Sequence, residues 1–236
     1  MIFSLFNILA GRIRRDNAKK IEVLRAKIEL KQDLKRAAQI QKAMLPKLDL
    51  LFDDMEIRGY CQPAIDIGGD YYDFLDLQNG NVAAALGDVT GHGFDSGLFM
   101  AIAKSCFVTQ ARIDYNIENM MKALEYAISH ITIPYHENAM QRMTFFMTFI
   151  YLLINRNERK ILVSNAGHPP LLHLSNNTIA KISATNCPLG MATILNMNDF
   201  GSTEIIYESG DIILLYSDGL IEGLNEFGVI IYADDL

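Results

Sequence analysis

Four short segments of the chain place aspartate, asparagine or histidine beside glycine. They are residues 67–74 (IGGDYYDF), 87–93 (GDVTGHG), 164–170 (SNAGHPP) and 216–220 (YSDGL). Asp88 and Asp218 each end an apolar strand-like run and are followed by a glycine-bearing turn, whereas Asp70 follows two glycines and opens such a run. A fold that gathers these strand ends would bring the carboxylates together.

Carboxylates gathered in this way repel one another and raise each other's pKa. A divalent cation removes that penalty, and a set of oxygen ligands without sulfur selects hard ions such as Mg²⁺ or Mn²⁺. Glycines beside the ligands let backbone carbonyls and substrate oxygens approach closely. Aspartates and glycines are also common in ordinary hairpin turns, so the residues alone leave a metal site and structural turns both open.

A dinucleotide-binding turn is a rival interpretation of the second segment. An apolar strand at 83–89 precedes a glycine-rich turn at 91–97 and a helix, which is the order of such a turn. The glycine spacing is GxGxxxG rather than GxGxxG, and no parallel strand–helix–strand repeat follows. Both departures disfavour this interpretation.

The elements that must position these segments fall into two parts. Residues 16–45 contain no glycine or proline and are rich in helix-forming residues, which predicts one long helix ending before Pro46. Ile21, Leu24 and Ile28 form an apolar stripe typical of a coiled coil or of a helix docked on a neighbouring domain. We expect a helical linker at 1–46 and a second domain at 47–236.

From about residue 54 the pattern changes to strands, a helix pair and further strands. An Asn-Gly turn joins strands predicted at 70–77 and 81–89. Helices are expected at 94–111 and 117–131, and strands at 145–155, 160–165, 171–174, 178–182, 204–207 and 212–216. This order predicts an α+β fold with antiparallel sheets and helices packed outside them.

Charge and cysteine content exclude several classes of protein. The net charge is −7, but residues 1–50 carry 12 Lys and Arg against 5 Asp and Glu. The acidic remainder makes nucleic acid an unlikely partner, because phosphate backbones attract clusters of Lys and Arg. Three isolated cysteines indicate neither a disulfide framework nor a zinc site and are typical of the cytoplasm.

The apolar segment 1–10 is too short to span a bilayer, which takes about 20 residues. The arginines come after the apolar run, whereas a secretory signal has its positive charges first. A helix end that packs on a partner is one interpretation. The other is peripheral membrane association through residues 1–15, with the arginines at lipid headgroups.

Six blocks taken in order resemble the signature series of SpoIIE/RsbU-type phosphatases. These are bacterial metal-dependent serine/threonine protein phosphatases of the PPM family, related to type 2C phosphatases. The resemblance covers roughly residues 37–236. It rests on residues 37–46 (AAQIQKAMLP), 68–74 (GGDYYDF), 87–93 (GDVTGHG), 165–170 (NAGHPP), 188–190 (PLG) and 216–222 (YSDGLIE).

The resemblance implies a two-sheet antiparallel β-sandwich flanked by helices, with the active site at one end. It implies that Asp70, Asp88 and Asp218 ligate two Mn²⁺ or Mg²⁺ ions, with the Val89 carbonyl as a further ligand. The ions would activate a water that attacks phosphorus, so no covalent phospho-enzyme is needed. His92 and His168 are either proton donors or loop residues that fix their turns.

The implied substrate is a phosphoserine or phosphothreonine on a small regulatory protein such as an anti-sigma-factor antagonist. The N-terminal helix would carry a regulatory signal, and a homodimer through it is one hypothesis. The segment 225–236 matches the start of a helix beyond which the family has further elements and one more ligating aspartate. Asp234 and Asp235 come too soon to be assigned as that ligand. A catalytically silent binding module with an incomplete metal site is therefore the alternative function.

Overall fold

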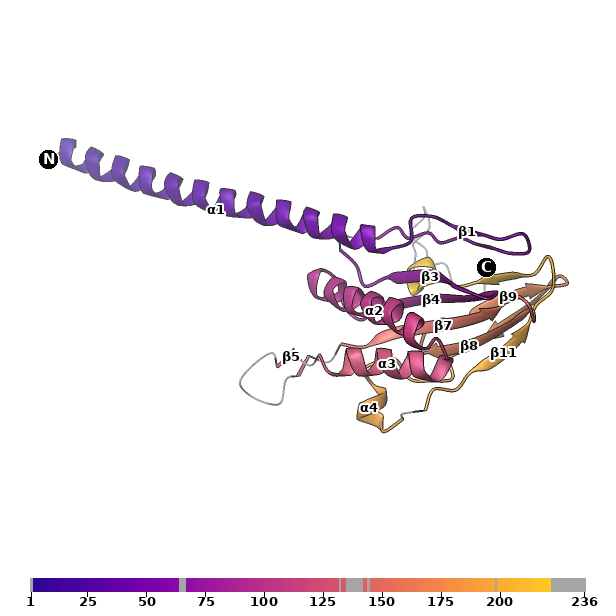
Figure 1. Ribbon diagram of the computed structural model, residues 1–236. Coiled ribbons are helices and arrows are strands. Elements are labelled where there is room, and N and C mark those ends of the chain that lie inside the picture. Colours follow the sequence, from indigo (N-terminus) through magenta and orange to yellow (C-terminus); the bar gives the residue numbers. More distant parts are fainter. Residues whose placement is uncertain are drawn as a thin grey trace.

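The computed structural model describes residues 2–63, 67–131, 133–134, 142–143, 145–197 and 199–221. A long helix leads into a body of stacked layers, with two helices on one side of a pair of antiparallel sheets (Figure 1). The predicted α+β sandwich with a preceding helix is confirmed. The predicted helix start at 225–236, with Asp234 and Asp235, lies outside the described residues.

Helix α1 (Ile2–Met44) begins well before the predicted residue 16 and projects away from the body (Figure 1). The apolar stripe of Ile21, Leu24 and Ile28 is 55%, 63% and 51% exposed. Near the C-terminal end of α1, Met44 packs against the buried core of the body. The domain boundary at residue 46 remains a proposal. No helix in the described part of the chain could span a membrane.

The larger sheet has five antiparallel strands in the order β11-β8-β7-β4-β3. The turn between β3 and β4 has positive φ at Asn79 (51°) and Gly80 (79°), as the predicted Asn-Gly hairpin requires. The strands are β3 (Tyr71–Gln78), β4 (Asn81–Val89), β7 (Met147–Asn155), β8 (Lys160–Ala166) and β11 (Thr203–Ile206).

The smaller sheet has three strands, β10 (Thr178–Ile182), β9 (Leu171–Ser175) and β12 (Ile212–Leu214), in that order. β9 and β10 pair as a hairpin at the positions predicted for two strands. The strands predicted at 204–207 and 212–216 also form, as β11 and β12, but they do not pair with each other. β11 pairs with β8 in the larger sheet and β12 with β9 in the smaller one, so the chain crosses between sheets around Gly210.

Two apolar layers hold the body together. Helices α2 (Phe94–Ile113) and α3 (Ile117–Ser129) cover one face of the larger sheet, with fully buried side chains such as Phe107, Met120 and Leu124. Ile150, Val163 and Leu171 belong to the second layer, between the two sheets. Burying one such side chain stabilises the fold by about 1.5–3 kcal/mol.

Short elements complete the described chain. The two-residue strands β1 (Leu50–Leu51) and β2 (Glu56–Ile57) form a small hairpin whose apolar residues pack against the layer between the sheets. The others are β5 (Ile133–Pro134), β6 (Arg142–Met143), α4 (Ala192–Leu195) and α5 (Asp218–Ile221).

Candidate metal centre

The hairpin of β3 and β4 brings Asp70 and Asp88 together. Asp70 directly precedes β3, Asp88 is the penultimate residue of β4, and the strands pair Tyr71 with Gly87. The Val89 amide donates a hydrogen bond to the Gly69 carbonyl over 3.3 Å, which extends the contact beyond the ladder. The two carboxylates therefore stand at the same end of the hairpin.

Asp218 reaches the same place from the smaller sheet, at the start of α5 and four residues after β12 ends. Burial, and after it the charges of Asp70 and Asp218, together raise the pKa of Asp88 to about 7. Burial also raises the pKa of Asp70; a hydrogen bond from Ser217 opposes this shift and the charge of Asp218 adds to it. The fold thus brings all three predicted residues within electrostatic reach of one another.

Gly69 makes the close approach of the two segments possible. A Cβ atom at this position would lie 2.5 Å from the Val89 carbonyl oxygen and 2.8 Å from Asp88 Oδ1. Because both distances are below van der Waals contact, a side chain would push the loop that bears Asp70 away from Asp88. The glycine expected to permit close approach does so here.

The chemistry of the donors fits a hard divalent cation, because the three side chains and the Val89 carbonyl supply oxygen ligands. A cation would also offset the repulsion that raises the pKa of Asp88. Among the described residues, however, no three His, Cys, Asp or Glu side chains are grouped closely enough to hold an ion as they stand. The carboxylates would have to converge further to form a complete site.

The two loop histidines differ in their surroundings. His92 is exposed in a turn between Gly91 and Gly93, which have φ of 89° and 90°. His168 is 3% exposed, and its Nδ1 lies 2.9 Å from Thr148 Oγ1. Burial lowers the pKa of His168 to about 4, although the nearby Tyr216 carbonyl favours the protonated ring. His168 is therefore neutral at pH 7 and suits a structural role.

His168 lies close to the backbone that carries two of the aspartates. Thr148 pairs with Asp88 in the larger sheet and also lies 3.5 Å from its carbonyl oxygen. Tyr216 lies two residues before Asp218. The His168 Nε2 atom is buried and has no hydrogen-bond partner at normal distance among the described residues, although the Tyr216 carbonyl is its neighbour. The sequence indicated the histidine but not its contact with Thr148.

Asp73 has a different role from the three aspartates. It is 3% exposed and accepts hydrogen bonds from Lys104 Nζ at 2.5 Å and from the Tyr71 hydroxyl at 2.9 Å. Lys104 lies on α2, so this buried ion pair ties the helix layer to β3. The carboxylate of Asp73 is thus neutralised by a protein cation.

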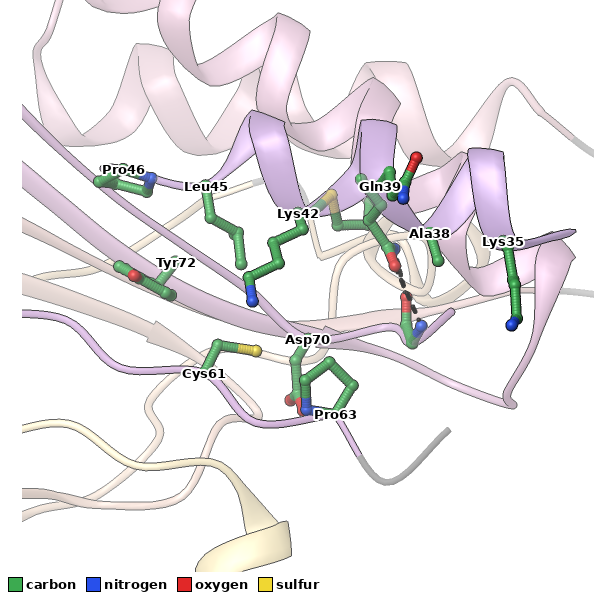
Figure 2. Close-up of a pocket in the computed structure, with 13 residues that line it drawn as sticks. Lys35, Ala38, Gln39, Lys42, Leu45, Pro46, Cys61, Pro63, Asp70 and Tyr72 are labelled. Atoms are coloured by element: carbon green, nitrogen blue, oxygen red, sulfur yellow. Dashed lines mark hydrogen bonds between the residues drawn. The ribbon is translucent and has the colours of Figure 1, made fainter. Parts of the chain in front are cut away.

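The end of α1 contacts the loop that carries Asp70, a contact that sequence analysis missed. The Gln41 side chain donates to the Gly68 carbonyl over 2.7 Å and accepts from the Gly68 amide over 3.2 Å. Beside this contact lies a cavity of about 360 Å³, with Lys42 on one side and Asp70 and Cys61 on the other (Figure 2). The sequence block at 37–46 contributed to the family resemblance, but nothing in it specified that Gln41 would contact a residue 27 positions away.

Comparisons with known proteins point to one family. A family model described as Stage II sporulation protein E (SpoIIE) matches residues 78–236, which is more than half of the chain. Asp88 and Asp218 lie within the matched range, and Asp70 precedes it.

Two curated relatives from Bacillus subtilis (strain 168) are similar in sequence. Phosphoserine phosphatase RsbP is 29% identical over 197 residues, covering 83% of this chain and 47% of the relative. Phosphoserine phosphatase RsbU is 27% identical over 203 residues, covering 85% and 56%. The chain therefore spans about half the length of each relative.

Among solved structures, the SiaA-PP2C domain of Pseudomonas aeruginosa matches with a TM-score of 0.69 and 17% identity. The match covers 89% of this chain and 80% of that domain. At this level of identity the likeness concerns the fold, and it agrees with the two-sheet sandwich described above.

The contrast between Asp88 and Asp73 yields a stability prediction. In EDTA, we expect Asp88→Asn to unfold at the same urea concentration as the parent or a higher one, because it removes a half-buried charge that Asp70 and Asp218 repel. We expect Asp73→Asn to lower the free energy of unfolding by about 2 kcal/mol, because it leaves Lys104 without its partner. The loss is smaller than for a fully buried pair, because the Lys104 side chain is 24% exposed. Urea denaturation followed by circular dichroism measures both. A loss for Asp88→Asn as large as that for Asp73→Asn would contradict the assigned repulsion.

Proposed function

Because the chain belongs to the SpoIIE family of PPM-type bacterial phosphatases, we propose that it is a metal-dependent phosphoserine/phosphothreonine protein phosphatase. The observation that carries this proposal is the convergence of Asp70, Asp88 and Asp218 from two sheets at one end of the sandwich. Bringing like charges together costs free energy, and groups whose pKa is shifted in this way cluster at functional sites.

In this proposal Asp70, Asp88 and Asp218 hold two divalent cations, Mn²⁺ or Mg²⁺, with the Val89 carbonyl as a further ligand. When bound, such ions lower the pKa of water to produce a nucleophile and offset charge on the phosphoryl oxygens. The residues of the chain supply the binding geometry. Gly69 keeps the Asp70 loop against Asp88, and Ser217 hydrogen-bonds to Asp70. Asp70 and Asp88 are half-buried and so partly desolvated, which strengthens their hold on a cation.

We further propose that the substrate is a phosphorylated regulatory protein of the anti-sigma-factor antagonist kind. The names of RsbP and RsbU as phosphoserine phosphatases support the phosphoserine part of this proposal. The protein substrate itself rests on family resemblance.

A catalytically silent binding module remains the second candidate. The observation in its favour is that the described carboxylates are not grouped closely enough to hold an ion as they stand. Such a protein would have the same fold and would bind the phosphoprotein without hydrolysing it. Catalytic turnover separates the two candidates.

Phosphate release is the direct test of the proposed function. We expect the parent chain to hydrolyse p-nitrophenyl phosphate and a phosphoserine peptide with Mn²⁺ or Mg²⁺ and to lose this activity in EDTA. Asp88→Asn should reduce the rate by at least about 100-fold, because it removes a carboxylate that every step of the two-metal chemistry uses. Absence of turnover with either metal in folded protein would favour the binding module.

We also propose that α1 mediates a homodimer. Ile21, Leu24 and Ile28 follow a 3-4 spacing and are more than half exposed, which is typical of a coiled-coil seam that awaits a partner helix. In the dimer, the Gln41–Gly68 contact would connect the helix pair to the loop that carries Asp70.

Light scattering of the parent and of the double variant Leu24→Glu/Ile28→Glu tests the dimer. We expect the parent to have twice the monomer mass and the variant to have the monomer mass, because the buried charges would repel across the seam. Ala26→Glu, at an exposed position opposite the seam, is the control and should leave the mass unchanged. A parent that is already monomeric would contradict the proposal.

A further inference from the structure

The cavity between α1 and the body is lined by one face of the helix. Lys35, Ala38, Lys42 and Leu45 contribute to this wall, and the facing wall includes Cys61, Pro63 and Tyr72 (Figure 2). Asp70 also lines the cavity, which therefore adjoins the carboxylates of the candidate metal centre. Its volume of about 360 Å³ is in the range of small ligand sites.

The two lysines of this wall have no acidic neighbour on their own helix. The residues three and four positions from Lys35 are Lys31, Gln32, Ala38 and Gln39, and those around Lys42 are Ala38, Gln39, Leu45 and Pro46. Helical ion pairs form at these spacings, as between Asp33 and Arg36. Lys35 and Lys42 thus present positive charge to the cavity without neutralisation along α1.

The charges of the cavity have opposite signs on its two sides. Burial raises the pKa of the Cys61 thiol; the charge of Asp70 raises it further, and that of Lys42 lowers it. Asp70 and Lys42 therefore both lie within electrostatic reach of Cys61. A substrate phosphate held at the aspartates through cations would place the neighbouring part of its chain beside Lys42.

The spacing of the lysines selects the shape of the ligand. Seven residues of helix at about 1.5 Å per residue separate Lys35 from Lys42 by about 10 Å. An extended peptide of the polyproline II type advances about 3.1 Å per residue with three residues per turn, so side chains three residues apart leave the same face about 9 Å apart. The apolar side chains Ala38 and Leu45 share this face of the helix and can contact the intervening residues.

We propose that this cavity binds an extended acidic segment next to the phosphoserine of the substrate protein. In the bound state, Lys42 and Lys35 pair with two carboxylates of the segment that are three residues apart. The proposal rests on the proposed phosphatase function and assigns α1 a direct part in choosing the substrate. The apolar residues of the wall contact the side chains between the two carboxylates.

The experiment uses the full chain with Mn²⁺ and two fluorescent phosphoserine peptides that differ only in their flanking residues. One peptide has glutamates three residues apart, and the other has lysines at the same positions. Fluorescence anisotropy measures the dissociation constant for the parent, Lys42→Glu, Lys35→Glu and Lys47→Glu. Lys47 is exposed on the chain after α1 and does not line the cavity, so it is a control with the same change in charge.

We expect the parent to prefer the glutamate peptide. Lys42→Glu should weaken its binding by about 5-fold or more, which corresponds to the upper range for an exposed ion pair. Lys35→Glu should act in the same direction, and Lys47→Glu should change the dissociation constant less than 2-fold, because Lys47 is exposed and does not line the cavity. Equal effects of Lys42→Glu and Lys47→Glu, or no preference for glutamate over lysine, would overturn the proposal.

Turnover of p-nitrophenyl phosphate by the parent is measured in parallel, because this small substrate has no flanking segment. Turnover together with peptide binding that ignores Lys42 would refute the docking site alone. No turnover together with binding that depends on Lys42 would refute the phosphatase function and leave an acidic-peptide site. The two failures are therefore distinguishable.

Discussion

The electrostatic repulsion among Asp70, Asp88 and Asp218 is the constraint on which this end of the molecule depends. Asp70 and Asp88 are half-buried and Asp218 is exposed, and burial together with its neighbours' charges raises the pKa of Asp88 to about 7. A chain that only needed to fold would separate these groups or give each a cation, as it does for Asp73 with Lys104. Their convergence makes sense if a divalent cation completes the cluster. The family membership gives that cation a chemical purpose.

The fold holds the carboxylates together in two ways. A single hairpin fixes Asp70 beside Asp88, and the missing side chain of Gly69 lets the loop lie against Val89. Asp218 comes from the other sheet, so its distance from the pair depends on how the sheets meet. Apolar packing between the sheets sets that distance. The buried His168 contacts Thr148 of the larger sheet and lies near Tyr216, two residues before Asp218. Helix α1 contacts this site through the loop that carries Asp70, because Gln41 hydrogen-bonds to Gly68 in that loop.

Local signals made much of this structure predictable. The Asn-Gly turn fixed the β3–β4 hairpin, and the ordered blocks indicated the family and the three aspartates before any contact was known. Contacts between distant residues could not be predicted, because no local pattern specifies them. The ion pair of Asp73 with Lys104 and the Gln41–Gly68 contact join residues 31 and 27 positions apart. The separation of β11 from β12 was missed for the same reason, since a short polar connection suits both a hairpin and a crossing between sheets.

Calorimetric titration with Mn²⁺ is the most direct test of the central claim that these three aspartates form a metal centre. The account predicts that the folded parent binds Mn²⁺ and that Asp70→Asn, Asp88→Asn and Asp218→Asn each weaken binding by at least about 10-fold, since each removes a charged oxygen ligand. Asp76→Asn changes an exposed aspartate on β3 and should bind Mn²⁺ like the parent. Binding that is equal in all four variants, or absent from the folded parent, would contradict the account.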